Sequence, residues 1–281
     1  MMNRNYNFAY LDEVTKRAIR RALLKAVAIP GHQVPFAARE MPVPYGWGTG
    51  GLQVTASVIG PHDVLKVIDM GSDESINATN IRRLFEQTTG VRTTTQTAVA
   101  TMIQTRHRIP ETPLRAGQIV VLQVANPEPL SRVVPSEAAA KQLHSLGEYD
   151  GVYLAMYEDI AKNGRIGRSR NYPVRVHGRY VMAPSSIPTF DNPKLHRSPA
   201  LFLFGAGRER RLYAVPPFTD VESLAFEDMP FAPPPPTEAC ALCGSTGSFV
   251  HGIRTGNGAK VYICSDTGHC RAVGSSSAGV L

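Results

Sequence analysis

The sequence has no long apolar run. No stretch approaches the roughly 18 consecutive apolar residues that a transmembrane helix needs, so no membrane span is expected. The first residues also lack the basic segment and the apolar run of a secretory signal peptide. Both absences predict a cytoplasmic chain without a membrane partner, in a compartment where thiols stay reduced.

Familiar nucleotide-binding motifs are missing as well. The glycine-rich segment Gly46–Gly51 matches neither the phosphate-binding loop GxxxxGK[ST] nor a GxGxxG turn between a strand and a helix. Its backbone N–H groups could still approach phosphate oxygens, because glycine leaves the backbone uncovered. Substrate contact and a plain connecting loop therefore both stay open for this segment.

Cysteine is scarce and confined to one end of the chain. There are four cysteines, and all of them lie in the last 42 of the 281 residues. Cys240 and Cys243 form a CxxC pair, 20 residues separate Cys243 from Cys264, and five separate Cys264 from Cys270. A CxxC turn with a second pair nearby is typical of a thiolate site for a metal or an iron–sulfur cluster.

Spacing alone leaves three interpretations of the four thiols. A structural zinc ribbon is the commonest assignment for CxxC…C…C in a small module. An iron–sulfur cluster takes four thiolates, or three with one iron left open. Two disulfides fit poorly with a reducing compartment. The segment Ser265–His269 is longer than is usual in a zinc knuckle, which would allow Cys270 to stay off the metal.

The chain is basic. Its formal net charge of +7 predicts an anionic partner, such as a phosphorylated substrate, an acidic protein or nucleic acid. The clearest basic cluster is Arg106, His107 and Arg108, shortly before Pro110. Two guanidinium groups beside an imidazole suit bidentate binding of a phosphate. An exposed basic loop explains the same three residues equally well.

The chain is long enough for a sizeable core and a small extra module. We predict an α+β fold: a mixed sheet with flanking helices, a central insertion and a small C-terminal four-cysteine module for a metal or a cluster. The core spans residues 1–126 and 176–232, and the insertion spans 127–175. Because four prolines in a row, Pro233–Pro236, form a stiff linker, residues 233–272 are set apart as the cysteine module. The Gly/Ser-rich residues 273–281 are expected to be a disordered tail.

Apolar periodicity predicts the main elements. Helices are expected at residues 10–27, 75–89, 136–146 and 153–162. Runs of apolar and β-branched residues predict strands at 52–59, 93–105, 119–124, 200–204 and 212–215, and a hairpin at 174–181. A loop is expected at 183–192.

Longer segments resemble one protein family over nearly the whole chain. They are Asn7–Glu13, Lys25–Gly31, Gln33–Phe36, Arg39–Pro42, Pro44–Gly51, Ile103–Pro113, Phe190–Lys194, Phe204–Glu209 and Tyr213–Phe218. The four cysteines complete the match, with one residue fewer in the long gap than in the family pattern. On these residues the chain resembles the PhnJ family, the catalytic subunits of bacterial carbon–phosphorus lyase.

The resemblance implies a radical S-adenosylmethionine (SAM) lyase with a [4Fe-4S] cluster. It implies α-D-ribose 1-methylphosphonate 5-phosphate as the substrate, and methane and α-D-ribose 1,2-cyclic phosphate 5-phosphate as the products. It also implies PhnG, PhnH, PhnI and an ABC-type ATPase as partner subunits, and no nucleic acid partner. The usual radical SAM motif CxxxCxxC is absent, as is expected of this family.

By the same resemblance, Cys240, Cys243 and Cys264 hold three irons of the cluster, and the fourth iron binds SAM. Gly31 carries a glycyl radical, made by the 5′-deoxyadenosyl radical, and hands it on to Cys270 as a thiyl. Cys270 is thus a candidate catalytic residue and also a candidate metal ligand. Apart from the resemblance, the same four thiolates could also close around zinc as a substitute metal in the isolated protein, with Cys270 as the fourth ligand.

The rival hypothesis is a zinc-ribbon protein, either a structural subunit or a binder of anions or nucleic acid. Gly31 separates the two hypotheses, because a binding module has no use for it beyond the turn that ends a helix at Pro30. If the chain is the lyase, Arg106, His107 and Arg108 are the candidates for holding the two phosphorus anions of the substrate.

Overall fold

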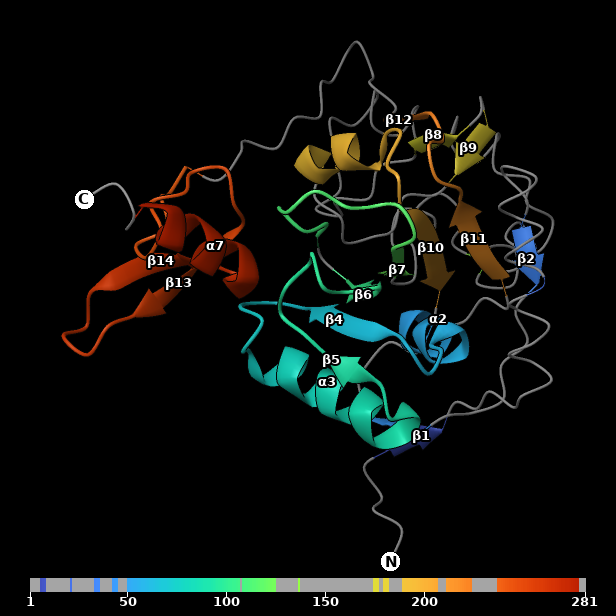
Figure 1. The fold of residues 1–281 in the computed structure, drawn as a ribbon, viewed down its shortest axis with the longest axis horizontal. Helices are drawn as coiled ribbons and strands as arrows, with labels where there is room; N and C mark the ends of the chain where they lie inside the picture. Colours follow the sequence, from blue (N-terminus) through green and yellow to red (C-terminus); the bar gives the residue numbers. More distant parts are fainter. Residues whose placement is uncertain are drawn as a thin grey trace, which may run out of the picture.

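The computed structural model of the chain describes slightly more than half of its residues (Figure 1). They are residues 6–8, 21, 33–35, 42–44, 50–106, 108–124, 136, 174–176, 179–181, 189–206, 211–223 and 237–277. Within these ranges the chain forms one seven-stranded sheet, three smaller sheets and a few helices. No helix among the described residues is long and apolar enough to cross a membrane.

The large sheet is mixed, as predicted. Its order is β2 (Gln33–Pro35), β11 (Arg211–Val215), β10 (Leu201–Ala206), β7 (Ile119–Val124), β6 (Met102–Thr105), β4 (Val64–Ile68) and β5 (Arg92–Thr93). The strands from β10 to β5 pair in parallel, and β11 and β2 extend them in antiparallel fashion. The central strands β7 and β10 are mostly apolar, because parallel sheets are buried on both faces.

Two helices cover one face of the sheet. They are α2 (Gly50–Val58) and α3 (Ile76–Thr89), and their apolar side chains share a cluster with Leu65, Val67 and Met102. Ser75 is the N-cap of α3, where its hydroxyl accepts from the N–H of Ala78. The helix ends at Gly90 because that residue adopts a φ of 71°, which favours glycine.

A strand pair, a three-stranded sheet and a 3₁₀ helix lie outside this core. β1 (Tyr6–Phe8) pairs with β3 (Pro42–Pro44). A three-stranded sheet joins β12 (Val221–Ser223) to the predicted hairpin of β8 (Val174–Val176) and β9 (Arg179–Val181). The 3₁₀ helix η1 (Thr189–Leu195) contacts β12.

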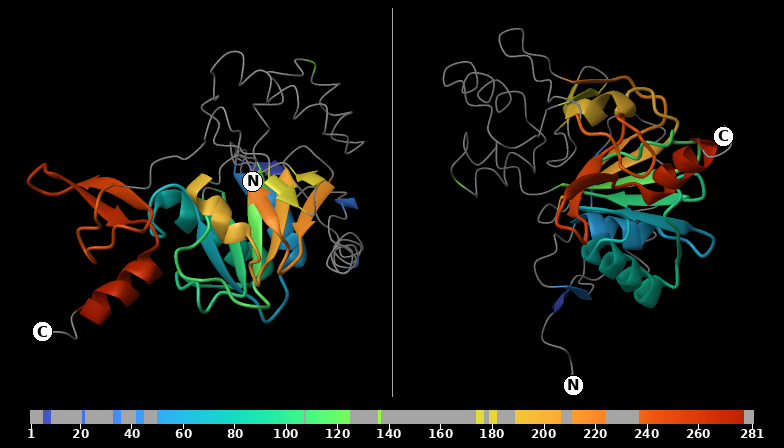
Figure 2. Two further views of the ribbon diagram at one scale, coloured as in Figure 1. Left: turned by 90° about the horizontal axis from the view of Figure 1, so that it is seen from above. Right: turned by 90° about the vertical axis from the view of Figure 1, so that its left-hand side faces the viewer.

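The cysteine module is a hairpin followed by a helix. It contains β13 (Val250–Arg254), β14 (Lys260–Cys264) and α7 (Thr267–Ser277). Figures 1 and 2 place it at one side of the sheet, with the hairpin pointing away from the core. The strands are antiparallel, and the register sets Cys264 opposite Val250.

The structure corrects the strand prediction for residues 52–59, because residues 52–58 lie in the helix α2. Leu52, Val54 and Ala56 are buried, and so are the polar residues Thr55 and Ser57. Since this helix is enclosed on nearly all sides, its composition is as apolar and β-branched as that of a buried strand. The predicted strand at 93–105 is in fact two strands, β5 and β6, with turns between them.

Three further predictions were wrong, two of them near the C-terminus and one before β10. The wide loop expected after Cys264 is the start of α7, and the tail expected to be disordered from Val273 stays helical to Ser277. The loop expected at 183–192 contains the start of η1. The helices predicted at 10–27, 136–146 and 153–162 lie outside the described residues, except for helical Arg21 and for Ser136. The domain boundaries, including the insertion at 127–175, stay a prediction.

Substitution of Phe85 measures how much the packing of α3 on the sheet contributes to the stability of the fold. Its side chain is fully buried in the shared cluster, so Phe85→Ala should lower the free energy of unfolding by about 3–5 kcal/mol. Ile76→Ala is the matched control on the same helix, since Ile76 is 79% exposed and should cost less than about 0.5 kcal/mol. Chemical denaturation measures both values. Equal losses for the two variants would contradict this packing.

Candidate active site

The four thiols converge on one point of the cysteine module. Their sulfur atoms all lie within 4.8 Å of one another, and three of the four residues are buried. The Sγ atoms of Cys240 and Cys270 are 3.7 Å apart, and those of Cys243 and Cys264 are 3.6 Å apart. Cys240 and Cys243 come from a turn before the hairpin, Cys264 ends β14, and Cys270 lies in the first turn of α7.

Local sequence accounts for the turn that carries the first pair. Gly244 donates its N–H to the carbonyl of Cys240 at 2.8 Å and has a φ of 70°, a conformation that favours glycine. The N–H of Cys240 reaches the carbonyl of Ser245 at 2.9 Å. Ala241 donates to Tyr262 of β14 at 2.7 Å, which fixes the turn against the hairpin and brings the first two thiols beside Cys264.

Hydrogen bonds and burial give the thiols different pKa values. The N–H groups of Leu242 and Cys264 point at Cys240 Sγ, at 3.4 and 3.2 Å. Burial alone would raise the pKa of Cys240, but the backbone N–H groups at its sulfur lower the pKa to about 6. Burial and the neighbouring thiols raise the pKa of Cys270 to about 12, and they raise the pKa of Cys264 as well.

The four thiols fit a metal centre. A tetrahedral ion that bonds thiolates at about 2.3 Å keeps their sulfurs about 3.8 Å apart, close to the two distances above. N–H groups that point at a sulfur, as at Cys240, are also common at iron–sulfur clusters. A cluster takes the same ligands but is larger than one ion. The donor set therefore suits both groups, and the spacing as it stands suits a single ion.

The sheet has a second feature of a binding site, a switch in strand order. From β4 the chain passes through α3 to β5 on one side, and then returns to β6 on the other side of β4. In open parallel sheets, ligands bind outside the carboxyl ends of the strands at such a point. Asp69 directly follows β4 and Arg106 directly follows β6. Their side chains form an ion pair at the switch point, with Arg106 Nη2 2.8 Å from Asp69 Oδ1.

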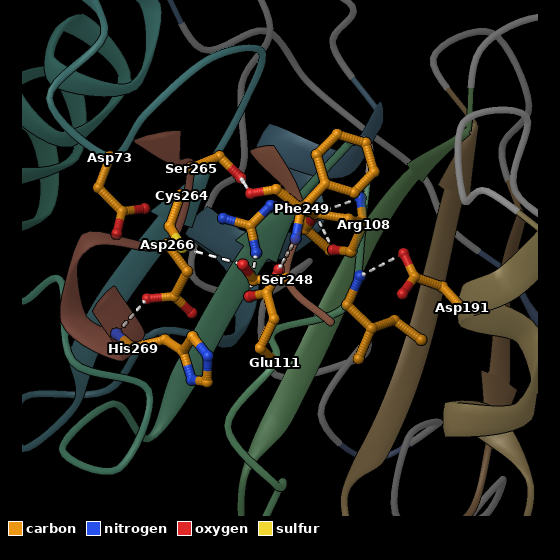
Figure 3. A network of polar contacts seen from close by, with 12 residues as sticks. Asp73, Arg108, Glu111, Asp191, Ser248, Phe249, Cys264, Ser265, Asp266 and His269 are labelled. Carbon is orange, nitrogen blue, oxygen red and sulfur yellow. Dashed lines mark hydrogen bonds and ion pairs between the residues drawn. The ribbon is translucent and has the colours of Figure 1, made fainter. Parts of the chain in front are cut away.

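Arg108 lies deeper, under the cysteine module (Figure 3). Its side chain is only 2% exposed, its Nη1 donates to Glu111 Oε2 at 2.7 Å, and its guanidinium lies 5.9 Å from the ring centre of Phe249. Its Nε and Nη2 atoms find no hydrogen-bond partner among the described residues. Such buried N–H groups usually bind a water or a ligand oxygen.

Polar contacts dock the module onto this edge of the sheet. The N–H of Phe249 donates to Glu111 Oε1 at 2.9 Å, and the N–H of Asp73 donates to the carbonyl of Ser265 at 3.0 Å. Asp73 Oδ2 also accepts from the N–H and the hydroxyl of Thr267, at 3.0 and 3.1 Å. These contacts hold the cysteine module against the segments that follow β4 and β6.

The structure thus brings together many of the residues singled out from the sequence. All four cysteines meet, and Arg106 and Arg108 lie at the sheet edge that carries the cysteine module. His107 and Gly31 lie outside the described residues, as do residues 46–49 of the glycine-rich segment.

The sequence analysis overlooked four residues where the module meets the sheet. Lys66 bonds to Asp73 and Asp266, and Gly268 lies against the backbone of Thr95. The one available signal was a lysine inside the apolar strand Val64–Ile68.

Titration of the metal-free protein tests the inequality of the thiols. We expect one thiolate to form near pH 6, seen by ultraviolet absorbance under reducing conditions, because the N–H groups at Cys240 stabilise its charge. Cys240→Ser should abolish this step. Cys270→Ser should keep it, since the pKa of Cys270 is raised to about 12. A first ionisation near the ordinary thiol value of 9.0 would contradict this assignment.

Comparisons with known proteins agree with the resemblance of the sequence. A family model described as "Phosphonate metabolism protein PhnJ" matches residues 4–275. The chain is 60% identical over 267 residues to alpha-D-ribose 1-methylphosphonate 5-phosphate C-P lyase of Escherichia coli (strain K12), and the match covers 95% of each chain. It is 58% identical over 266 residues to the protein of that activity from Rhizobium meliloti (strain 1021), across 94% of this chain and 90% of that one. With the family model and both relatives matched over nearly its whole length, the chain belongs to the PhnJ family of phosphonate metabolism proteins.

Proposed function

We propose that the chain is a carbon–phosphorus lyase of phosphonate metabolism. Its substrate is α-D-ribose 1-methylphosphonate 5-phosphate, and its products are methane and α-D-ribose 1,2-cyclic phosphate 5-phosphate. The observation that carries the proposal is the convergence of four thiols beside the strand switch point, in a chain 60% identical to a lyase named for this substrate. A C–P bond offers no good leaving group, so acid–base groups alone have little to act on.

Three thiols hold the cofactor in this proposal. Cys240, Cys243 and Cys264 bind a [4Fe-4S] cluster, whose remaining iron is the site for SAM; together they supply one-electron chemistry. The lowered pKa of Cys240 supports its role, because a metal ligand must be the thiolate. Cys243 and Cys264 approach the same point from the CxxC turn and the end of β14.

Cys270 is the reactive thiol. Its pKa of about 12 is consistent with an intact S–H bond at neutral pH, which an ordinary thiol also keeps, and an intact S–H is what loses a hydrogen atom to form a thiyl radical. The thiyl sulfur bonds to phosphorus as the P–CH₃ bond breaks and a methyl radical leaves. The ribose 2-hydroxyl then displaces the sulfur from phosphorus, which closes the cyclic phosphate and restores Cys270.

Gly31 exchanges hydrogen atoms with Cys270 and with the methyl radical in this reaction. A radical on its Cα takes the hydrogen atom of Cys270, and the restored Cα–H gives a hydrogen atom to the methyl radical, so methane forms and the glycyl radical returns. Glycine suits this role because a Cα without a side chain can become planar between two peptide groups. Gly31 lies outside the described residues, so its part rests on the family resemblance.

The substrate's two anionic groups are held by basic residues after β6. Arg106 is 28% exposed and lies at the switch point, so its guanidinium can reach a ligand while Asp69 orients it. Arg108 has two buried N–H groups open to an oxyanion that enters between the sheet and the module. His107 is proposed as the third group from its place in the sequence.

The assembly is also a proposal. The family resemblance favours a cytoplasmic complex with PhnG, PhnH and PhnI, joined by an ABC-type ATPase subunit. The net charge of +7 is consistent with anionic substrate and partner surfaces.

A zinc-bound protein is the alternative that one observation favours. The two Sγ distances of 3.6 and 3.7 Å match a single tetrahedral ion better than a cluster. In this alternative all four thiols are structural ligands, and the chain is a zinc-ribbon subunit that binds anions or nucleic acid. The same closed centre would also arise from zinc as a substitute metal in an enzyme that normally holds a cluster.

Anaerobic reconstitution with iron and sulfide separates these possibilities. We expect dithionite to produce the electron paramagnetic resonance signal of a reduced [4Fe-4S] cluster, and SAM to yield 5′-deoxyadenosine. Cys243→Ser should lose both, because one iron loses its ligand. Cys270→Ser should keep both but release no methane. Zinc that resists replacement, with no SAM cleavage under any condition, would refute the lyase proposal.

Substrate binding by Arg106 is tested by Arg106→Gln. Loss of one charged hydrogen-bond donor costs about 1.5–3 kcal/mol, so KM should rise roughly 10- to 100-fold. Arg254→Gln is the control. It removes the same charge, but Arg254 lies at the exposed end of the β13–β14 hairpin. An unchanged KM in Arg106→Gln, measured by methane release, would count against this role.

A further inference from the structure

One lysine lies inside the sheet. Lys66 occupies the middle of β4, where its side chain is fully buried and every other residue of the strand is apolar. A buried ammonium group is costly unless it is paired and hydrogen-bonded. Lys66 Nζ donates to Asp73 Oδ2 at 3.0 Å, to Asp266 Oδ1 at 3.3 Å and to the carbonyl of Thr95.

These three partners belong to three different segments. Asp73 lies between β4 and α3, Thr95 follows β5, and Asp266 belongs to the cysteine module. Lys66 therefore joins the sheet, the loop after β5 and the module at one atom. Replacing buried ion pairs by apolar residues is often neutral or even stabilising, so stability alone does not account for these charges.

Asp266 links this junction to Cys270. Asp266 Oδ1 accepts a hydrogen bond from Lys66 Nζ, and the same oxygen accepts one from the N–H of His269 at 2.9 Å. The backbone carbonyl of Asp266 accepts the N–H of Cys270 at 3.0 Å. Asp266 thus caps the first turn of α7, and the position of its carboxylate sets the position of the turn that carries Cys270.

Gly268 gives a second, independent observation at the same junction. A Cβ on Gly268 would lie 2.6 Å from the carbonyl oxygen of Thr95 and 3.1 Å from Cα of Gln96. Both are backbone atoms, which cannot turn aside as a side chain can. The first turn of α7 therefore lies against the loop after β5 with no room for a methyl group, beside the carbonyl that Lys66 also contacts.

We propose that Lys66 and Gly268 are positioning residues for Cys270. Lys66 fixes the capping carboxylate of Asp266, and Gly268 permits the close approach of α7 to the loop after β5. Together they hold the thiol at the carboxyl ends of β4 and β6, where the substrate is proposed to bind. The assignment rests on the proposed role of Cys270, but the seating of α7 can be measured without it.

The test compares Gly268→Ala with Gly247→Ala. Gly247 lies in the same module, has no heavy atom within 4 Å of an added Cβ and does not have a positive φ, so it is a matched control. We expect Gly268→Ala in the full-length metal-free chain to speed alkylation of Cys270 at least tenfold, measured by mass spectrometry. Gly247→Ala should match the wild type. Equal Cys270 rates in the two variants would overturn the proposal.

A second measurement uses the reconstituted enzyme with its proposed partner subunits. Gly268→Ala should still release 5′-deoxyadenosine from SAM, but the ratio of methane to 5′-deoxyadenosine should fall at least tenfold because Cys270 is displaced. A parallel loss of both products would indicate a damaged module and would overturn a positioning role. If the wild type itself releases no 5′-deoxyadenosine, the proposed function fails, whereas the alkylation rates still decide the seating of α7.

Lys66→Met removes the charge at the junction but leaves two buried carboxylates. The companion variant Lys66→Met/Asp73→Asn/Asp266→Asn keeps the hydrogen-bonding shape without that unpaired charge. We expect both variants to speed Cys270 alkylation, as Gly268→Ala does, and hydrogen exchange at residues 266–272 to increase with it. If the triple variant folds with wild-type alkylation and exchange, the ion pairs do not position Cys270 and that part of the proposal is wrong.

Discussion

The parallel pairing of β4 with β6 is the constraint on which the site depends. Parallel strands end at the same edge of a sheet, so residues that directly follow them meet although 36 residues lie between Asp69 and Arg106. After β4 the chain passes through α3 to β5, on the side of β4 that faces away from β6. No direct connection therefore runs from the end of β4 to β6 across the edge where the two strands end. The cysteine module occupies this edge through Asp73 and Glu111. The sheet thereby brings the far end of the chain to its own switch point.

Local patterns predicted the parts of this arrangement that depend on neighbouring residues. The cysteine spacing gave convergent thiols, and the helix from Ser75 and the strand at 119–124 were confirmed because propensity and burial agree there. Residues 52–59 were misassigned because a helix that is buried on nearly all sides loses its polar stripe. The junction at Lys66 could not be predicted, since the lysine and Asp266 are 200 residues apart and nothing local to either identifies the other.

The four thiols are alike in chemistry and unlike in surroundings. Cys240 receives backbone N–H groups, which favour its thiolate, whereas Cys270 lies among neighbouring thiols in a buried place, which favours S–H. The pKa of Cys264 is raised as well, so Cys240 differs from both Cys264 and Cys270. The surroundings therefore favour the thiolate of Cys240, and they do not by themselves separate the ligands from Cys270.

The interior of the cysteine module consists largely of its own ligands. Its buried cluster is Cys240, Cys264 and Cys270, with Val250 and Ile263 packed against them beside Cys243. A two-stranded hairpin is only marginally stable by itself, so the contacts of the module with Asp73 and Glu111 add to what holds it folded. A metal held by the four thiols would add its binding free energy to the stability of the folded module. Such a metal would thereby also protect the C-terminal part of the chain against proteolysis.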